Sequence, residues 1–178
     1  MKRMNQSPPG HRWPTPQRRG AIMALMPAII VLLCMVVGFS FDMGYLYLVK
    51  SDLQSASDSA ALAAAFKMSE KNGAKVKPVT TQAILYAELN EPDYGNVLVA
   101  GDVEMGSWDF GSKSFTPGNG KANAVRTIVR RDGTNTAKVK MFFMSLFGVN
   151  EVAVTATSIA AFEVDKKGKR SSLARLVQ

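Results

Sequence analysis

The pattern of apolar and polar positions changes along the chain, and its first part predicts a membrane helix. Residues 21–41 form an apolar run without a charged side chain. As a helix rising ~1.5 Å per residue, this run spans roughly the 30 Å hydrocarbon core of a bilayer. Pro27 lies inside the run, where a proline removes a backbone donor and favours a kink. Gly38, near the outer end, would permit close packing against another helix.

Beyond this run the pattern becomes amphipathic without losing its helical period. Apolar residues recur at steps of three and four, namely Leu46, Val49, Leu53, Ala56, Ala60 and Ala63. The pattern predicts one continuous helix to about Ser69, ended by Asn72 and Gly73 and roughly 70 Å long when counted from residue 21. Its apolar face narrows from Leu and Val to Ala, so a second helix or a sheet could approach closely. We expect this face to pack on the chain's own domain, on a partner protein, or on both.

The second half of the chain carries a short helical pattern followed by strand patterns of period two. A helix is predicted at 80–89, and strands at 96–105, 113–116, 122–131, around 137–141 and at 151–162. The Asp132-Gly133 turn predicts that the strands on either side of it form a hairpin. The three aromatics and Leu146 within 142–148 predict a core plug or a helical turn capped by Gly148.

Together these elements predict an α+β fold. A long N-terminal transmembrane and amphipathic helix precedes a small antiparallel β-rich, pilin-like exported domain. The predicted division is a basic cytoplasmic tail at 1–20, the transmembrane helix at 21–41, its exported continuation at 42–72, a small α+β periplasmic domain at 73–165 and a basic disordered tail at 166–178.

The net charge of +8 is concentrated at the two ends. Residues 1–20 and 166–178 each hold five Lys or Arg and no acid, so 22 − 10 leaves 12 basic residues against 14 acidic ones. A basic groove for nucleic acid is therefore not expected. Five basic residues precede the apolar run, and Lys50 is the one basic residue among the ten that follow it. This asymmetry predicts a single-pass inner-membrane protein with a cytoplasmic N-terminus and a periplasmic C-terminal domain.

The rare reactive residues argue against catalysis. The single cysteine, Cys34, lies in the apolar run, and the single histidine, His11, precedes it on the predicted cytoplasmic side. Neither a Ser-His-Asp nor a Cys-His set can then assemble in the exported part, and His-dependent zinc sites fail for the same reason. We expect no enzymatic activity, no catalytic residue, no cofactor and no metal. Scattered acids such as Asp102 and Glu104 are expected to be solvated.

Three processing alternatives compete with a plain anchor. A secretory signal would be cleaved after Ser40, and a lipoprotein would be modified at Cys34. The third alternative, cleavage after Gly20 by a prepilin peptidase, rests on the family resemblance described in the next paragraph. Each alternative predicts a different mature protein.

Several residues occur in an order typical of one family. They are Arg18-Arg19-Gly20, the apolar run with Pro27, then Asp42, Gly44, Leu53-Gln54, Ala56, Asp58 and the alanine-rich block 60–65. This order resembles the N-terminal segment of TadE/TadG-like proteins of tight-adherence (Flp) type IV pilus assembly. The similarity continues more weakly through Trp108-Asp109 and Phe142-Phe143. Leu25 stands where prepilin-peptidase substrates of this type usually carry glutamate.

The resemblance implies a structural or assembly component acting through contacts with other pilus-assembly or pilin subunits. The apolar helix also allows a helix-mediated oligomer. The positions predicted to interact are Pro27, Asp42, Leu53, Gln54, Ala56, Asp58, Ala60, Ala63 and Trp108. Asp42 would either mark the outer membrane interface or pair with a basic residue of a neighbouring helix. Two other functions fit the pattern: a membrane-tethered module binding an envelope ligand through Trp108, and a minor pilin processed after Gly20.

Overall fold

The computed structural model describes residues 19–70, 75–118, 120, 122–164 and 170–177. The chain divides into two compact units, residues 1–37 and residues 38–178. The described part of the first unit is helical, with exposed side chains at 25–37. The second unit holds the rest of that helix and all other elements.

The first element, α1, runs from Arg19 to Ser69 and contains Pro27. This confirms the predicted continuous helix and its C-terminal end. The helix is long and apolar enough to cross a membrane, and 11% of its tested apolar stretch is buried by the rest of the chain. The core helix of a soluble protein would be mostly buried, so this exposure favours a membrane span.

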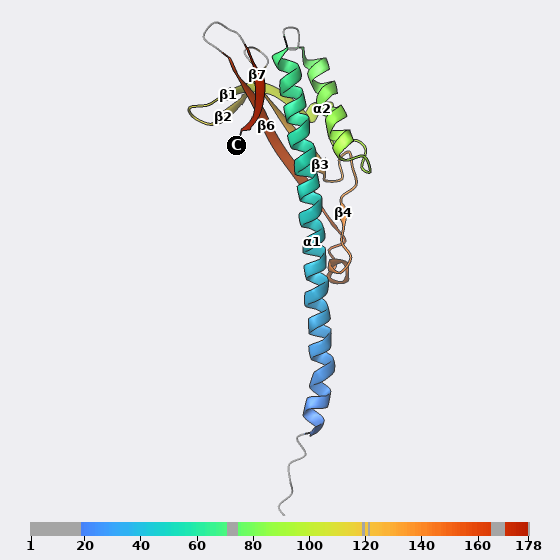
Figure 1. Ribbon diagram of the computed structural model, residues 1–178. Coiled ribbons are helices and arrows are strands. Elements are labelled where there is room, and N and C mark those ends of the chain that lie inside the picture. The colour runs from blue at the N-terminus through green and yellow to red at the C-terminus, as the bar shows by residue number, and fades with distance from the viewer. Residues whose placement is uncertain (1–18, 71–74, 119, 121, 165–169, 178) are drawn as a thin grey trace, which may run out of the picture. The chain divides into compact units, whose positions relative to one another are not determined.

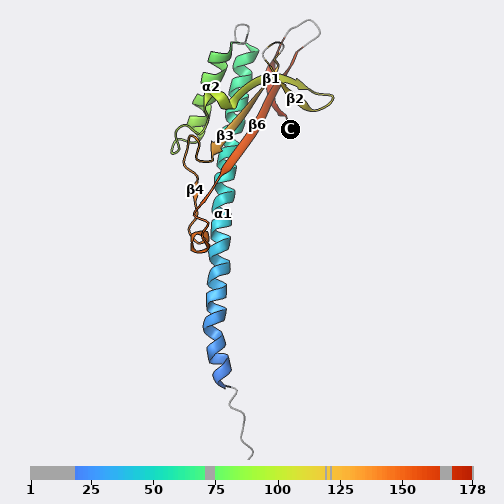
Figure 2. The same ribbon diagram turned by 180° about the vertical axis from the view of Figure 1, so that it is seen from behind.

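The second unit also contains a second helix and a five-stranded main sheet. Its main sheet is antiparallel, with strand order β2-β1-β3-β6-β7. The strands are β1 Val103–Asp109, β2 Ser114–Pro117, β3 Ala124–Arg131, β6 Val154–Val164 and β7 Arg170–Val177. Helix α2, Val76–Asn90, lies beside α1 (Figures 1 and 2). This arrangement confirms the predicted α+β class.

The main core lies between the two helices and one face of the sheet. Alternate residues of β3 and β6 point into it, as the period-two pattern predicted for 122–131 and 151–162. Members with no exposed surface include Leu53, Ala56, Ala60 and Ala64 of α1, Val79, Ala83 and Ala87 of α2, and Val125, Val129 and Phe162 of the sheet. Ala56, Ala60 and Ala64 are called the alanine stripe below.

Two predicted boundaries were wrong for local reasons. Helix α2 begins at Val76 rather than 80, because Pro78 falls in the first turn, where the missing N–H of a proline is tolerated. The strand predicted at 96–105 begins at Val103, because Asn96 takes a positive φ of 64° and Ala100–Asp102 form a short 3₁₀ helix, η1. Val97 and Leu98 remain buried, but in a loop.

The C-terminal segment also differs from its prediction. The sequence predicted disorder at 166–178, yet β7 pairs with β6 from Ile159↔Val177 to Val164↔Arg170. Leu173, Leu176 and Val177 interrupt the basic residues and supply the apolar positions of a strand. Residues 165–169 and 178 lie outside the described part of the chain, as do Asn72 and Gly73.

The hairpin predicted around Asp132-Gly133 does not form. Strand β3 pairs with β1 and β6, whereas β4, Val139–Lys140, pairs with β5, Glu151–Val152, in a separate two-stranded sheet. This ribbon carries residues 141–150, which we call the aromatic loop. The loop contains the 3₁₀ helix η2, Met144–Phe147, capped by Gly148 at φ 86°. The predicted helical turn is therefore confirmed, but the predicted core plug is wrong, since Phe142, Phe143, Leu146 and Phe147 are exposed.

Candidate functional site

Most of the predicted interaction residues of α1 are used inside the domain. Leu53, Ala56 and Ala60 have no exposed surface and belong to the core beneath the sheet. Alanine side chains are short, so they allow the backbone of α1 to lie close to β3 and β6. These three positions are therefore unavailable to a partner while the domain is folded.

Polar residues on the same side of α1 bind the sheet directly. The Gln54 Nε2 donates to Asp58 Oδ1 at 2.9 Å and to Ser158 Oγ at 2.9 Å, and the Ser158 hydroxyl donates to Asp58. Deeper in the interface, the Thr127 hydroxyl donates to the Ser57 carbonyl at 3.0 Å, with both residues fully buried. These bonds fix the register of the helix on the strands, because a shift would leave buried polar groups unpaired.

Asp42 is held by the main chain of the aromatic loop. Its Oδ1 accepts the N–H of Phe142 at 3.1 Å, and its Oδ2 accepts those of Phe143 at 2.9 Å and Met144 at 2.7 Å. The residue has 0% exposure. Its carboxylate therefore serves an internal contact, a role that the sequence did not predict. Carboxylates bound by several N–H groups form strong, charge-assisted bonds.

Aromatic rings surround this carboxylate. Phe41 makes edge contacts with Phe142 and Phe143 at centroid distances of 6.1 Å each, and Tyr45 contacts Phe142 at 5.9 Å. One turn earlier, Phe143 lies against Gly38, where an added Cβ would come within 2.5 Å of its ring. The helix positions 38, 41, 42 and 45 thus form one face that receives the loop.

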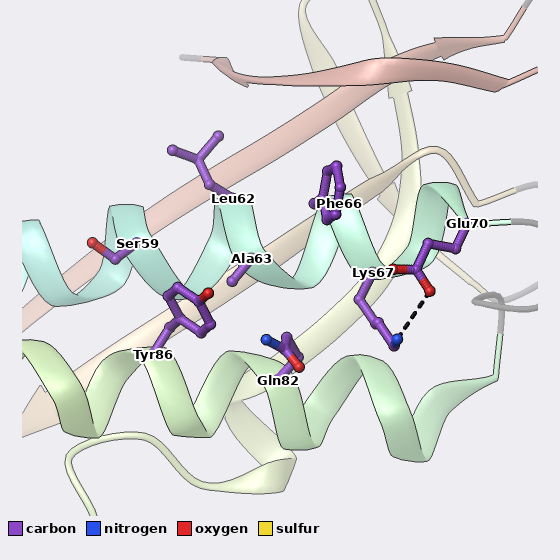
Figure 3. A pocket seen from close by; sticks show the side chains of 8 residues that line it. All are labelled: Ser59, Leu62, Ala63, Phe66, Lys67, Glu70, Gln82 and Tyr86. Carbon is purple, nitrogen blue, oxygen red and sulfur yellow. Dashed lines mark hydrogen bonds and ion pairs between the residues drawn. The ribbon is translucent and has the colours of Figure 1, made fainter.

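Ala63 lies on a different side of α1, in an open groove of about 460 Å³ between α1 and α2. Figure 3 shows Gln82 and Tyr86 of α2 pointing toward Ala63. The groove is also lined by Ser59, Leu62, Phe66, Lys67 and Glu70. Lys67 Nζ pairs with Glu70 Oε2 at 2.9 Å. Phe66 is half-exposed, and sequence reasoning missed it because it follows directly on the alanine-rich block.

The remaining predicted positions lie apart from this groove. Trp108 is 7% exposed and packs with Ala124 and Ala161 on the sheet face opposite the helices, so its ring is not displayed for a surface ligand. Pro27 is exposed within α1, and Gly20 lies in the first turn of that helix.

One buried charged cluster lies beside the core. The Arg131 guanidinium lies over the Tyr94 ring at 3.7 Å. Burial raises the pKa of Glu91, and the negative charge of Asp52 raises it further, while Arg131 opposes the shift. Among the described residues, no three His, Cys, Asp or Glu side chains come together in a way that could hold a metal ion.

Comparison with known families covers both the helix and the domain. A family described as putative Flp pilus-assembly TadE/G-like matches residues 20–67. A second, described as putative Tad-like Flp pilus-assembly, matches residues 50–160, which is more than half of the chain. No curated protein and no solved structure matches the chain. The order of residues in the N-terminal half, the α+β fold and these two matches agree, and the chain belongs to the TadE/TadG-like proteins of Tad (Flp) pilus assembly.

Proposed function

We propose that this protein is a single-pass inner-membrane component of Tad pilus assembly that acts by binding other pilus-assembly or pilin subunits. Its N-terminus would be cytoplasmic and its sheet domain periplasmic. The observation that carries the proposal is the segment 50–67, which belongs to both family matches. This segment of α1 binds the sheet on one side and lines the groove on another. The family describes assembly proteins, so no catalytic step is invoked.

The bonds between α1 and the sheet explain why the contact with a partner should be rigid. Gln54, Asp58 and Ser57 bind β3 and β6, and the alanine stripe packs beneath them. Because α1 is fixed to the sheet, its groove residues have defined positions relative to the rest of the domain. Preorganisation of this kind lowers the entropy that a partner must overcome on binding.

The groove is an exposed surface of α1 that such a partner could cover. Leu62, Ala63 and Phe66 of α1 supply apolar lining, and the Lys67–Glu70 ion pair lies at one end (Figure 3). The short side chain of Ala63 leaves space for a partner's side chain. Phe66 and Tyr86 are partly exposed, so a partner could bury their rings. Apolar side chains with polar groups at their rim are typical of protein interfaces. We assign this groove to an apolar helix or strand of another pilus-assembly subunit.

The test replaces Ala63 with phenylalanine, which fills the groove from within. We expect the variant to remain in the membrane and to unfold like the parent, but to lose co-purification with the other Tad components. The matched control is Ala63→Ser, which changes polarity with little change in volume and should retain the partners. Full co-purification by Ala63→Phe would exclude the groove as the docking surface.

A further inference from the structure

The aromatic loop combines large apolar side chains with high exposure. Leu146 is 81% exposed, Phe147 is 63% exposed, and Phe142, Phe143 and Val149 are exposed as well. No charged residue occurs between Lys140 and Glu151. An exposed apolar patch of this kind marks a surface that contacts a membrane or another protein. The position of the loop beside α1 favours the membrane.

The loop lies at the level where the predicted membrane segment ends. Phe143 contacts Gly38, and Phe142 contacts Phe41, so the rings reach the last turn of the apolar run 21–41. At ~1.5 Å per residue, Gly38 lies about 6 Å along the helix below Asp42, toward the membrane interior. On the same turn Phe39, Phe41 and Met43 are exposed. The exposed rings of the loop and of the helix therefore form one apolar belt.

From these contacts we infer that the aromatic loop enters the periplasmic leaflet of the bilayer, with Leu146 and Phe147 among the lipid acyl chains. The inference rests on the proposed membrane anchor and adds a second membrane contact to it. The folded domain would then be held against the membrane surface at two places. A helix alone would leave the domain free to tilt about its exit point.

The polar groups of the loop are arranged in a way that lipid requires. Backbone N–H groups are costly in hydrocarbon unless they are bonded. Asp42 accepts those of Phe142, Phe143 and Met144, and the turn of η2 bonds Leu146 N–H to the Phe143 carbonyl at 3.1 Å. The Ser145 hydroxyl donates to the Phe142 carbonyl at 2.6 Å. Asp42 is itself fully buried, so its charge is kept from the acyl chains.

The residues around the loop suit the headgroup region. Tyr47 is 78% exposed on α1, one turn and a half beyond Asp42, and tyrosines are enriched at membrane interfaces. Lys140 and Glu151 pair in register where the loop leaves its ribbon, and both are exposed. Charges at this position can remain in the headgroup layer while the uncharged tip lies deeper.

The experiment measures the depth of Leu146 in a bilayer. In the full chain with Cys34→Ser, single cysteines are introduced by Leu146→Cys, by Leu32→Cys in the membrane segment, and by Leu173→Cys, an exposed position of β7. Each is labelled with an environment-sensitive fluorophore and reconstituted into vesicles of phosphatidylethanolamine and phosphatidylglycerol. Quenching is compared between nitroxide-bearing acyl chains and aqueous iodide.

We expect the Leu146 label to be quenched by the acyl-chain nitroxide, nearly as strongly as the Leu32 label, and protected from iodide. Its depth should be about 5–10 Å, as for other interfacial apolar segments. The Leu173 label should show the reverse. Iodide quenching at Leu146 equal to that at Leu173 would place the loop in water and overturn the inference. Protection from both quenchers would mean that protein covers the loop, which also overturns it. Loss of lipid quenching at Leu32 would instead refute the anchor itself.

Discussion

The alanine stripe of α1 and the aromatic loop are both apolar, yet the stripe is fully buried and most of the loop is exposed. The stripe lies under a sheet that its short side chains allow to approach closely. The loop is attached to α1 mainly by three amides on one carboxylate, with ring edges around them. Burial holds the first region, while directed hydrogen bonds hold the second. The side chains of the loop are consequently free to contact lipid.

The largest expected effect comes from overfilling the stripe. Ala60→Phe inserts a ring where α1 meets the sheet with no free space, and we expect a loss of about 3 kcal/mol in the free energy of unfolding. Denaturant unfolding of the purified protein in detergent measures it. The matched variant Ala63→Phe places the same ring in the groove and should change stability by less than about 0.5 kcal/mol. Equal losses for the two variants would show that the stripe and the groove are not distinct surfaces.

A smaller effect is expected from the attachment of the loop. Asp42→Ala removes the acceptor of three N–H bonds and should cost about 2 kcal/mol. Hydrogen exchange of the amides at 142–144 should accelerate, while exchange in β3 stays slow. Asp42→Asn keeps one acceptor oxygen and should give an intermediate rate. If the loop amides exchange no faster in Asp42→Ala, the carboxylate does not hold the loop.

The sequence predicted the helix well because its two signals were long and regular. The apolar run and the three-four spacing of Leu53, Ala56 and Ala60 established both the length of α1 and its buried face. Strands β3 and β6 followed from period-two alternation. By contrast, the separate pairing of β4 with β5 depends on contacts far along the chain, and no local pattern encodes it.

The candidate site was less predictable for the same reason. Asp42 is a lone charge in the sequence, and its bonds come from residues 100 to 102 positions away. The aromatic residues at 142–147 resembled a core segment, because composition does not reveal which side of a ribbon faces solvent. The uninterrupted absence of charge between Lys140 and Glu151 was the signal available for a membrane contact.

The smallest expected effect is a pH dependence of the free energy of unfolding, caused by the buried residue Glu91. Burial raises the pKa of Glu91 above its unfolded value, so the folded state binds its proton more tightly than the unfolded state does. Its contribution to stability is therefore present at low pH and lost as the pH rises through the raised pKa. Glu91→Gln should remove this dependence and stabilise the domain near pH 7. The free energy of unfolding is measured from pH 4.5 to 7.5 in both proteins. If it changes with pH by the same amount in the parent and in Glu91→Gln, the raised pKa of Glu91 is contradicted.

The role of α1 as a docking surface can be tested most directly by photo-cross-linking in intact cells. A benzophenone amino acid replaces Phe66 in the groove, and in a second strain it replaces Leu173 on β7, which is also exposed. We predict cross-links from position 66 to another Tad pilus-assembly or pilin subunit, and none to that subunit from position 173. An absence of cross-links at 66, or the same products from both positions, would contradict the account.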